Sequence, residues 1–226
     1  MDDFALEGEV LRDALDKIAS INQLLGGNQL TLHSVQKLIH SLPKHHQITI
    51  VDVGCGNGDM LRELADYGLK NNYNFRLIGI DANHFTINHA QKLSEKYKNI
   101  SFQCEDIFSQ AFEELEYDIV LCTLTLHHFK NKEIIQLMAV FYANSKIGIV
   151  INDLHRSALA YRLFQGLCFV FQLNSMSRED GLTSILRGFK KVDLKAFSEK
   201  LKFNNYTIHW RWAFRYQWII SKNQIA

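Results

Sequence analysis

The sequence lacks several features that would mark particular classes of protein. Its 226 residues include 25 basic and 24 acidic side chains. No overall field therefore draws the chain to a polyanion, and nucleic acid is not expected as a partner. The four cysteines form no CxxC pair, which is typical of reduced thiols in a cytoplasmic protein. Polar and charged side chains interrupt the most apolar window, residues 158–176, so no stable membrane insertion is expected.

Other absences narrow the class further. The first residues lack both the basic and the apolar segment of a secretory signal, so no signal peptide is expected. Proline is nearly absent, with Pro43 as its only occurrence. A hydrophobic content of 47% and a charged content of 22% are ordinary, and the length suits one globular domain or one domain with a small cap.

The most informative segment is residues 48–59, ITIVDVGCGNGD. A run dominated by β-branched residues leads to glycines at positions 54, 56 and 58, and an amphipathic helical pattern follows over 60–67. This order predicts a buried strand, a tight turn and a helix whose N-terminus faces the turn. A Cβ in such a turn would block close approach of the backbone to a ligand, so a nucleotide-like cofactor is expected above the strand.

The glycine spacing distinguishes between cofactors. Asp59 stands where a dinucleotide fingerprint needs its third glycine, so NAD is not favoured and no seat for a pyrophosphate is expected. VDVGCGNGD, with Asp52 inside the strand, resembles motif I of the class I S-adenosylmethionine (SAM) methyltransferases. The resemblance implies SAM as the cofactor. A glycine-rich turn without any ligand is the alternative.

Acidic residues follow the next two predicted strands. Strand 75–80 ends at Asp81, whose two acceptor oxygens suit both ribose hydroxyls; the alternative is a cap for a helix over 85–97. Strand 100–104 leads to Asp106 and Ile107. In the family that the chain resembles, such residues accept from the adenine amino group and pack on the ring, although an acid after a strand is common in loops.

The fourth strand, 117–122, continues into LHHF at 126–129, and together these resemble motif IV of the same family. The predicted cofactor-binding residues are Asp52, Gly54, Cys55, Gly56, Gly58, Asp81, Ala82, Asp106, Ile107, Thr123 and Leu124. A base assists methyl transfer when the acceptor is a phenol or an activated ring carbon, and histidine titrates near neutrality. His127, His128 and His155 are therefore the candidate catalytic residues; alternatively, they only shape the pocket.

The alternation of strands and helices predicts an α/β fold. We expect a Rossmann-like class I methyltransferase sheet of seven strands, mostly parallel, with an antiparallel edge hairpin over 205–221. The predicted domains are an N-terminal helical cap over 1–45, with helices at 4–25 and 31–40 separated by Gly26 and Gly27, and a methyltransferase domain over 46–226. A helical insertion over 157–190 follows the fifth strand, 146–151. The cap either covers the cofactor end or packs on the sheet.

The acceptor is the least determined feature. INQLLGG, NDLHRSALAYRLF and DGLTSILRGFK resemble small-molecule methyltransferases of polyketide- and quinone-type pathways. The insertion is rich in large apolar residues, so it either forms a pocket for a lipophilic phenol or quinol or merely covers the sheet. The alternatives are a non-catalytic SAM-binding partner protein and a methyltransferase that acts on RNA or protein; the oligomeric state is left open.

Two specialised classes of methyltransferase are not expected. The single proline excludes the (Asn/Asp)-Pro-Pro-aromatic motif of amino-directed nucleic-acid methyltransferases. Thr123 and Leu124 stand where a magnesium-dependent catechol methyltransferase carries an acidic residue, so no metal is predicted. The tryptophans and arginines of segment 205–221 could stack on RNA, but their alternation is more typical of a half-buried edge strand.

Overall fold

The computed structural model describes residues 6–222 and contains one mixed sheet in the order β3-β2-β1-β4-β5-β7-β6. The first five strands pair in parallel, whereas β7 runs antiparallel to both of its neighbours. The strands are β1 (Gln47–Val53), β2 (Asn74–Asp81), β3 (Ile100–Cys104), β4 (Tyr117–Thr123), β5 (Ser145–Leu154), β6 (Tyr206–Arg211) and β7 (Arg215–Ser221). The predicted fold class is confirmed.

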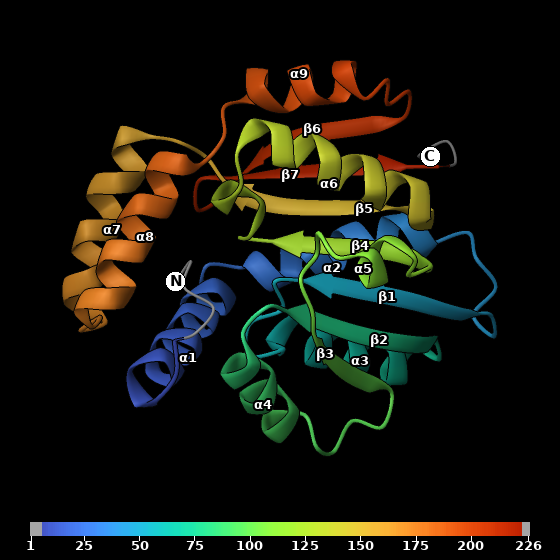
Figure 1. Ribbon diagram of the computed structural model, residues 1–226, viewed down its shortest axis with the longest axis horizontal. Helices are drawn as coiled ribbons and strands as arrows, with labels where there is room; N and C mark the ends of the chain where they lie inside the picture. The colour runs from blue at the N-terminus through green and yellow to red at the C-terminus, as the bar shows by residue number, and fades with distance from the viewer. Residues whose placement is uncertain (1–5, 223–226) are drawn as a thin grey trace.

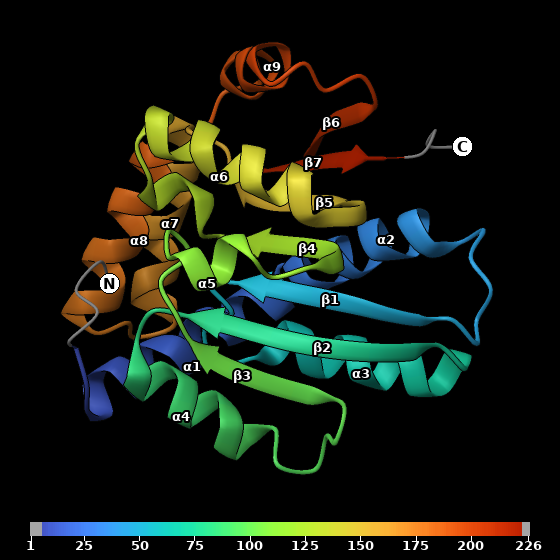
Figure 2. The same cartoon turned by 45° about the vertical axis from the view of Figure 1, so that its right-hand side comes forward.

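Helices cover both faces of this sheet. They are α1 (Glu9–Leu24), α2 (Gly27–Ile39), α3 (Asp59–Asn71), α4 (His84–Leu93), α5 (Gln110–Glu113), the 3₁₀ helix η1 (Leu126–His128), α6 (Asn131–Asn144), α7 (Ala158–Val170), α8 (Ser175–Arg187) and α9 (Lys191–Lys200). Apolar residues of α2, α3 and α4 pack on one face, and those of α5, α6 and α9 on the other. Figures 1 and 2 show α1, α7 and α8 together at the carboxyl ends of the parallel strands.

The N-terminal helices depart from the predicted boundaries. α2 begins at Gly27, four residues before the predicted start, and Gly26 alone makes the turn, with a left-handed φ of +75°. Gly27 is needed for a different reason, because a Cβ there would lie 1.9 Å from Oδ1 of Asn22. Residues 4 and 5 of the first predicted helix lie outside the described residues. Among residues 6–222, no helix has both the length and the apolarity that a membrane span requires.

Other boundaries also differ. α3 extends to Asn71, beyond the helical pattern expected over 60–67, and α4 ends at Leu93 rather than at 97. The predicted helical insertion over 157–190 consists of two helices, α7 and α8. The first turn of α8 is capped because Asn174 accepts from the backbone N–H of Ser177. Gly181 of α8 lies directly against the ring of Phe164 in α7.

The edge hairpin β6–β7 is half buried, as its alternating pattern indicated. Trp218 on β7 is fully buried and packs 6.3 Å from the ring of Phe203. Trp210 and Trp212 near the turn are exposed. The aromatic residues of the buried strand β7 thus belong to the core, whereas Trp210 of β6 and Trp212 of the turn face solvent.

Candidate active site

The glycine loop after β1 has the backbone geometry that its sequence predicts. Gly54, Gly56 and Gly58 all have positive φ, at +69°, +53° and +77°. A Cβ on Gly54 would lie 2.3 Å from Oγ1 of Thr125, whereas nothing lies closer than 4.0 Å to one on Gly56. The loop is therefore closely packed on the β4 side and leaves the backbone of Gly56 accessible, which is what a backbone–ligand contact needs.

Asp81 stands at the end of β2 and is held in one orientation. Its Oδ2 accepts from the backbone N–H of Gly56 at 3.3 Å and its Oδ1 from that of Asn83 at 3.0 Å. Burial raises the pKa of Asp81, and the two backbone donors oppose the shift. The cap of α4 is Asn83, which accepts from Thr86 N–H. The alternative role of Asp81 as a helix cap is therefore wrong, and its remaining acceptor capacity is available to a ligand.

Three carboxylates surround the glycine loop. Asp52 is 3% exposed, and burial, followed by the charges of Asp59 and Asp81, raises its pKa well above the ordinary value. Such mutual repulsion makes the loop favourable for a cation. The positively charged sulfonium and ammonium groups of SAM fit this cluster of three carboxylates. Burial likewise raises the pKa of the Cys55 thiol, so Cys55 lines the loop as a neutral side chain.

The residues expected around adenine follow β3. Asp106 is exposed, and its Oδ1 accepts from the backbone N–H of Phe108 at 2.9 Å. Ile107 is partly buried against the cluster on the α6 face. Ala82, directly after Asp81, is partly buried, and its carbonyl accepts from the Cys104 thiol. The structure places these residues beside the carboxyl ends of β2 and β3, and their contact with adenine stays a prediction.

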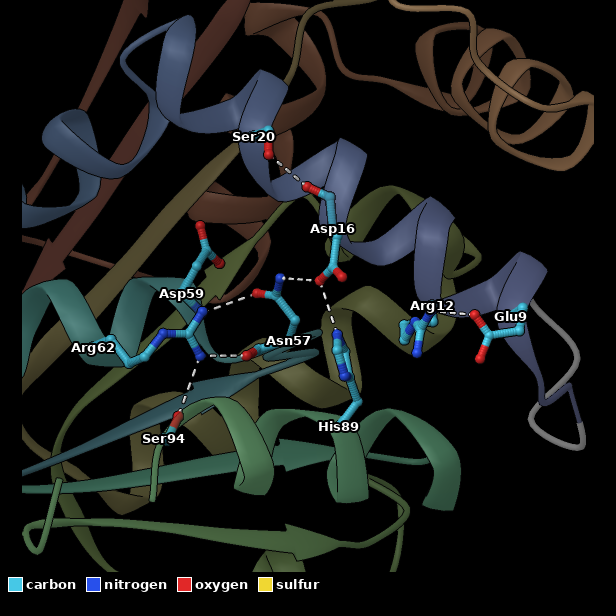
Figure 3. A network of polar contacts seen from close by, with 9 residues as sticks. All are labelled: Glu9, Arg12, Asp16, Ser20, Asn57, Asp59, Arg62, His89 and Ser94. Carbon is cyan, nitrogen blue, oxygen red and sulfur yellow. Dashed lines mark hydrogen bonds and ion pairs between the residues drawn. The ribbon is translucent and has the colours of Figure 1, made fainter. Parts of the chain in front are cut away.

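A polar network ties α1 to the glycine loop, as Figure 3 shows. Asp16 of α1 accepts from Nδ2 of Asn57 at 2.9 Å and faces Nε2 of His89 at 2.8 Å. Arg62 donates to the carbonyl of Asn57 at 2.6 Å and to Ser94 at 3.2 Å. The helix, the loop and α4 are thereby joined. Sequence reasoning missed this network because directly bonded members, such as Asp16 and His89, are up to 73 positions apart.

The start of α2 is joined to the ends of β4 and β5. Leu124 has a positive φ of +54° and donates to the carbonyl of Asn152 at 2.9 Å. Asn152 donates in turn to the carbonyl of Gly27 at 2.9 Å and to Thr31 at 3.0 Å. The hydroxyls of Thr31 and Thr123 are 3.3 Å apart. Thr123 and Leu124 thus lie beneath the α1–α2 junction.

His127 forms a buried pair with Asp153. Its Nδ1 lies 2.6 Å from Oδ1 of Asp153, and its backbone N–H donates to Oδ2 at 3.2 Å. Burial would raise the pKa of Asp153, but His127 and the backbone N–H groups of His127 and Leu154 outweigh it and lower the pKa. Nε2 of His127 is buried and has no hydrogen-bond partner among residues 6–222. Because Nδ1–H donates to the carboxylate, a neutral ring has its proton acceptor at Nε2.

The three candidate histidines do not form one group. The rings of His127 and His128 lie 4.3 Å apart. His155 follows β5, accepts at Nδ1 from Nε1 of Trp210 at 3.2 Å, and packs 5.2 Å from Tyr216. Burial, followed by the charges of Lys190 and Arg156, lowers the pKa of His155. His155 therefore belongs to the edge hairpin, whereas the first two lie in η1.

Sequence reasoning also missed two site residues. Asp153 was not among the predicted site residues, although its position at the end of the strand next to β4 was a signal that it faces the LHHF segment. Arg215, at the start of β7, is 4% exposed. Nothing in its local sequence distinguishes it from the other arginines of the hairpin.

Comparison with solved structures finds this fold in known methyltransferases. The plantazolicin methyltransferase BpumL, solved with S-adenosylhomocysteine (SAH), aligns with a TM-score of 0.68 and 18% identity over 92% of this chain and 89% of that one. The magnesium protoporphyrin IX methyltransferase of Synechocystis PCC 6803, solved with SAM, aligns with a TM-score of 0.57 and 16% identity over 91% and 84%.

Curated relatives are similar over shorter spans. The ubiquinone biosynthesis O-methyltransferase of Coxiella burnetii is 29% identical over 102 residues, which are 45% of this chain and 39% of the relative. The protein-lysine N-methyltransferase EFM4 of Saccharomyces cerevisiae is 38% identical over 81 residues, 34% of each. The chain thus spans about two fifths or less of the length of these two relatives.

A family model covers most of the core. The model described as a methyltransferase domain matches residues 44–192, a span that runs from β1 through the glycine loop, Asp81, the His127–Asp153 pair and α8. The neighbours solved with SAM and SAH agree with the predicted cofactor. The chain belongs to the methyltransferase-domain family.

Proposed function

We propose that this chain transfers a methyl group from SAM to a small, lipophilic aromatic acceptor of the phenol or quinol type. The observation that carries the proposal is the buried His127–Asp153 pair at the ends of β4 and β5, beside a glycine loop with an oriented Asp81. The glycine loop and Asp81 suit SAM. The His127–Asp153 pair offers a base for the acceptor.

Each residue has a distinct role in this proposal. SAM, when bound, supplies a methyl group already activated by its sulfonium. Asp81 accepts from the ribose hydroxyls, and the backbone of the glycine loop lies against the methionine part. His127 takes the acceptor's proton at Nε2, and Asp153 stabilises the resulting imidazolium and fixes the ring. Alignment of the acceptor against the methyl group supplies most of the rate.

The helices after β5 support a lipophilic acceptor. α8 contacts η1, the segment that contains His127 and His128, and α7 packs against α8. α7 exposes several large apolar side chains, namely Leu159, Leu163, Phe169 and Val170. Exposed apolar side chains on a helix close to the histidine-containing segment η1 favour an aromatic ligand with few polar groups over a sugar or a nucleotide.

A protein acceptor is the second candidate. The similarity to the yeast protein-lysine N-methyltransferase supports it, although that similarity extends over only 34% of the chain. We also infer that the chain acts in the cytoplasm, a proposal supported by its four free cysteines. The division into a cap over 1–45 and a domain over 46–226 stays a prediction.

Calorimetry tests the cofactor half. Wild-type protein should bind SAM and SAH but not NAD, and Asp81→Ala should weaken SAM binding roughly tenfold or more because it removes a carboxylate that accepts hydrogen bonds. Asp66→Ala is the control, since Asp66 is an exposed acidic residue of α3 that accepts from Tyr97. Folded wild-type protein that binds no SAM would refute the proposal.

Labelled SAM tests the acceptor half. Transfer should be measured across phenols, quinols, polar metabolites, RNA and a lysine-rich protein extract. We expect lipophilic phenols or quinols to be methylated fastest. Preferential labelling of protein would favour the second candidate, and preferential labelling of RNA would exclude both.

A further inference from the structure

Arg215 carries a buried guanidinium on which two of the three nitrogens have no hydrogen-bond partner in the described part of the chain. The residue is 4% exposed, and its Nε and Nη1 are buried without a hydrogen-bond partner in the described part of the chain. Burial lowers the pKa of Arg215 to about 10, against the opposing charge of Asp153, so the side chain is a cation at neutral pH. Buried cations are normally paired, since leaving water is costly.

The guanidinium lies at the N-terminus of α2. Its Cζ is 3.1 Å from the point that a Cβ on Gly27, the first residue of α2, would occupy. The N-terminus of this 13-residue helix has no side-chain cap, and its partial positive charge adds to that of Arg215. The positive charge of Arg215 and the partial positive charge of the α2 N-terminus therefore lie close together in the protein interior. The charge of Asp153 acts on Arg215, but this carboxylate is already bonded to His127.

The absence of a side chain on Gly27 lets the side chains of Asn22 and Arg215 approach the start of α2. Oδ1 of Asn22, which is buried and has no hydrogen-bond partner among the described residues, lies 1.9 Å from the same Cβ point. A methyl group there would press on both side chains. The unpaired Nε and Nη1 donors of Arg215 and the uncapped start of α2 together suit a flat, anionic, hydrogen-bond-accepting group.

We propose that Arg215 and the N-terminus of α2 bind the carboxylate of one of the two small ligands of the methyl transfer. This inference rests on the proposed function and narrows its ligand chemistry. A carboxylate matches the planar fork of arginine, which binds two acceptor oxygens side by side. The carboxylate belongs either to an aromatic acid as acceptor, on the side of the His127–Asp153 pair, or to the amino-acid tail of SAM.

Arg215→Met tests the site, with Arg211→Met as the matched control. Arg211 lies opposite Arg215 in the β6–β7 register, is half buried and donates from Nε to Gln217. Arg215→Met should weaken binding of the carboxylate-bearing ligand roughly tenfold or more, because charged hydrogen bonds are lost. Arg211→Met should leave binding unchanged.

Pairs of ligands that differ only in the carboxylate identify its source. If SAM supplies it, Arg215→Met weakens binding of SAM but not of decarboxylated SAM. If the acceptor supplies it, Arg215→Met raises the KM for 4-hydroxybenzoate-type acids and leaves neutral phenols unchanged. Equal effects of the variant on both members of each pair, or no effect on any, would overturn the inference. Normal SAM binding by the wild type would then still uphold the proposed function.

The melting temperature of Arg215→Met shows whether Arg215 serves a ligand site or only stabilises the fold. Without ligand, Arg215→Met should melt at or above the wild-type temperature, because a buried unpaired charge is replaced by an apolar chain of similar length. A structural arginine, bridged by water to Asn22, predicts a lower melting temperature, and that result would also overturn the inference. Should the methionine variant not fold, Gly27→Ala and added benzoate on the wild type provide the test. Benzoate should raise the wild-type melting temperature more than benzamide does, and Gly27→Ala should abolish the difference.

Discussion

Asp153→Asn removes the charge from the buried pair while keeping the size of the side chain. Asp153 is 1% exposed and accepts from Nδ1 of His127 at 2.6 Å, from the backbone N–H of His127 at 3.2 Å and from that of Leu154 at 2.6 Å. An amide turns one acceptor into a donor that faces these N–H groups. We expect a loss of about 1.5–3 kcal/mol in the free energy of unfolding, which lowers Tm by roughly 3–12 °C for a chain of this size.

The loss should depend on pH in a defined direction. Because the pKa of Asp153 is lowered in the folded protein, the stability that its charge contributes is fully present above the unfolded pKa of about 4. It disappears as pH falls through the folded pKa. The difference between wild type and Asp153→Asn should therefore be constant from about pH 7 to 5 and shrink below about pH 4.

Urea unfolding followed by tryptophan fluorescence measures the difference, since Trp218 is fully buried. Asp118→Asn is the control, because Asp118 accepts from the backbone N–H of Thr49 at 2.7 Å and has no histidine partner; it should cost about 1 kcal/mol. Asp153→Asn should also slow methyl transfer more than it weakens SAM binding. A variant within about 0.5 kcal/mol of the wild type at pH 7, or a loss that persists unchanged at pH 3, would refute the reasoning.

Three further outcomes follow from the loop and its neighbours. Gly54→Ala should destabilise the protein by roughly 2 kcal/mol or more in urea unfolding, because its Cβ would lie 2.3 Å from Oγ1 of Thr125 at a φ of +69°; a neutral result would mean that the loop can move. Asp16→Ala removes the acceptor of Asn57 and should weaken SAM binding severalfold by calorimetry, with unchanged affinity showing that α1 does not order the loop. Because the pKa of Asp52 is raised, acidification should neutralise this carboxylate. It should then weaken binding of SAM, whose sulfur is positively charged, more than binding of SAH, whose sulfur is neutral. An equal loss of affinity for both ligands would contradict the electrostatic role of Asp52.

The sequence alone determined the order of strands and helices and the conformation of the glycine loop. Glycine spacing at 54, 56 and 58 fixes a turn that other residues rarely adopt, and each has a positive φ in the structure. Alternation of strands and helices determines a parallel sheet, and an acid at a strand end, such as Asp81, must lie at the same edge as the glycine turn. These are local patterns, so residues close in sequence were enough to predict them.

The tertiary structure decided which distant side chains meet. His127 and Asp153 are 26 positions apart, and Arg215 reaches Gly27 from the opposite end of the chain. Their proximity depends on the order of the strands and on where α2 begins, which no local pattern encodes. The sheet order also separates His155, which accepts a hydrogen bond from Trp210 of the hairpin, from His127 and His128 in η1. Local sequence patterns determine the backbone conformation of the glycine loop. The burial and the hydrogen-bond partners of side chains depend instead on how whole helices and strands pack together. The chemistry of this site depends on both.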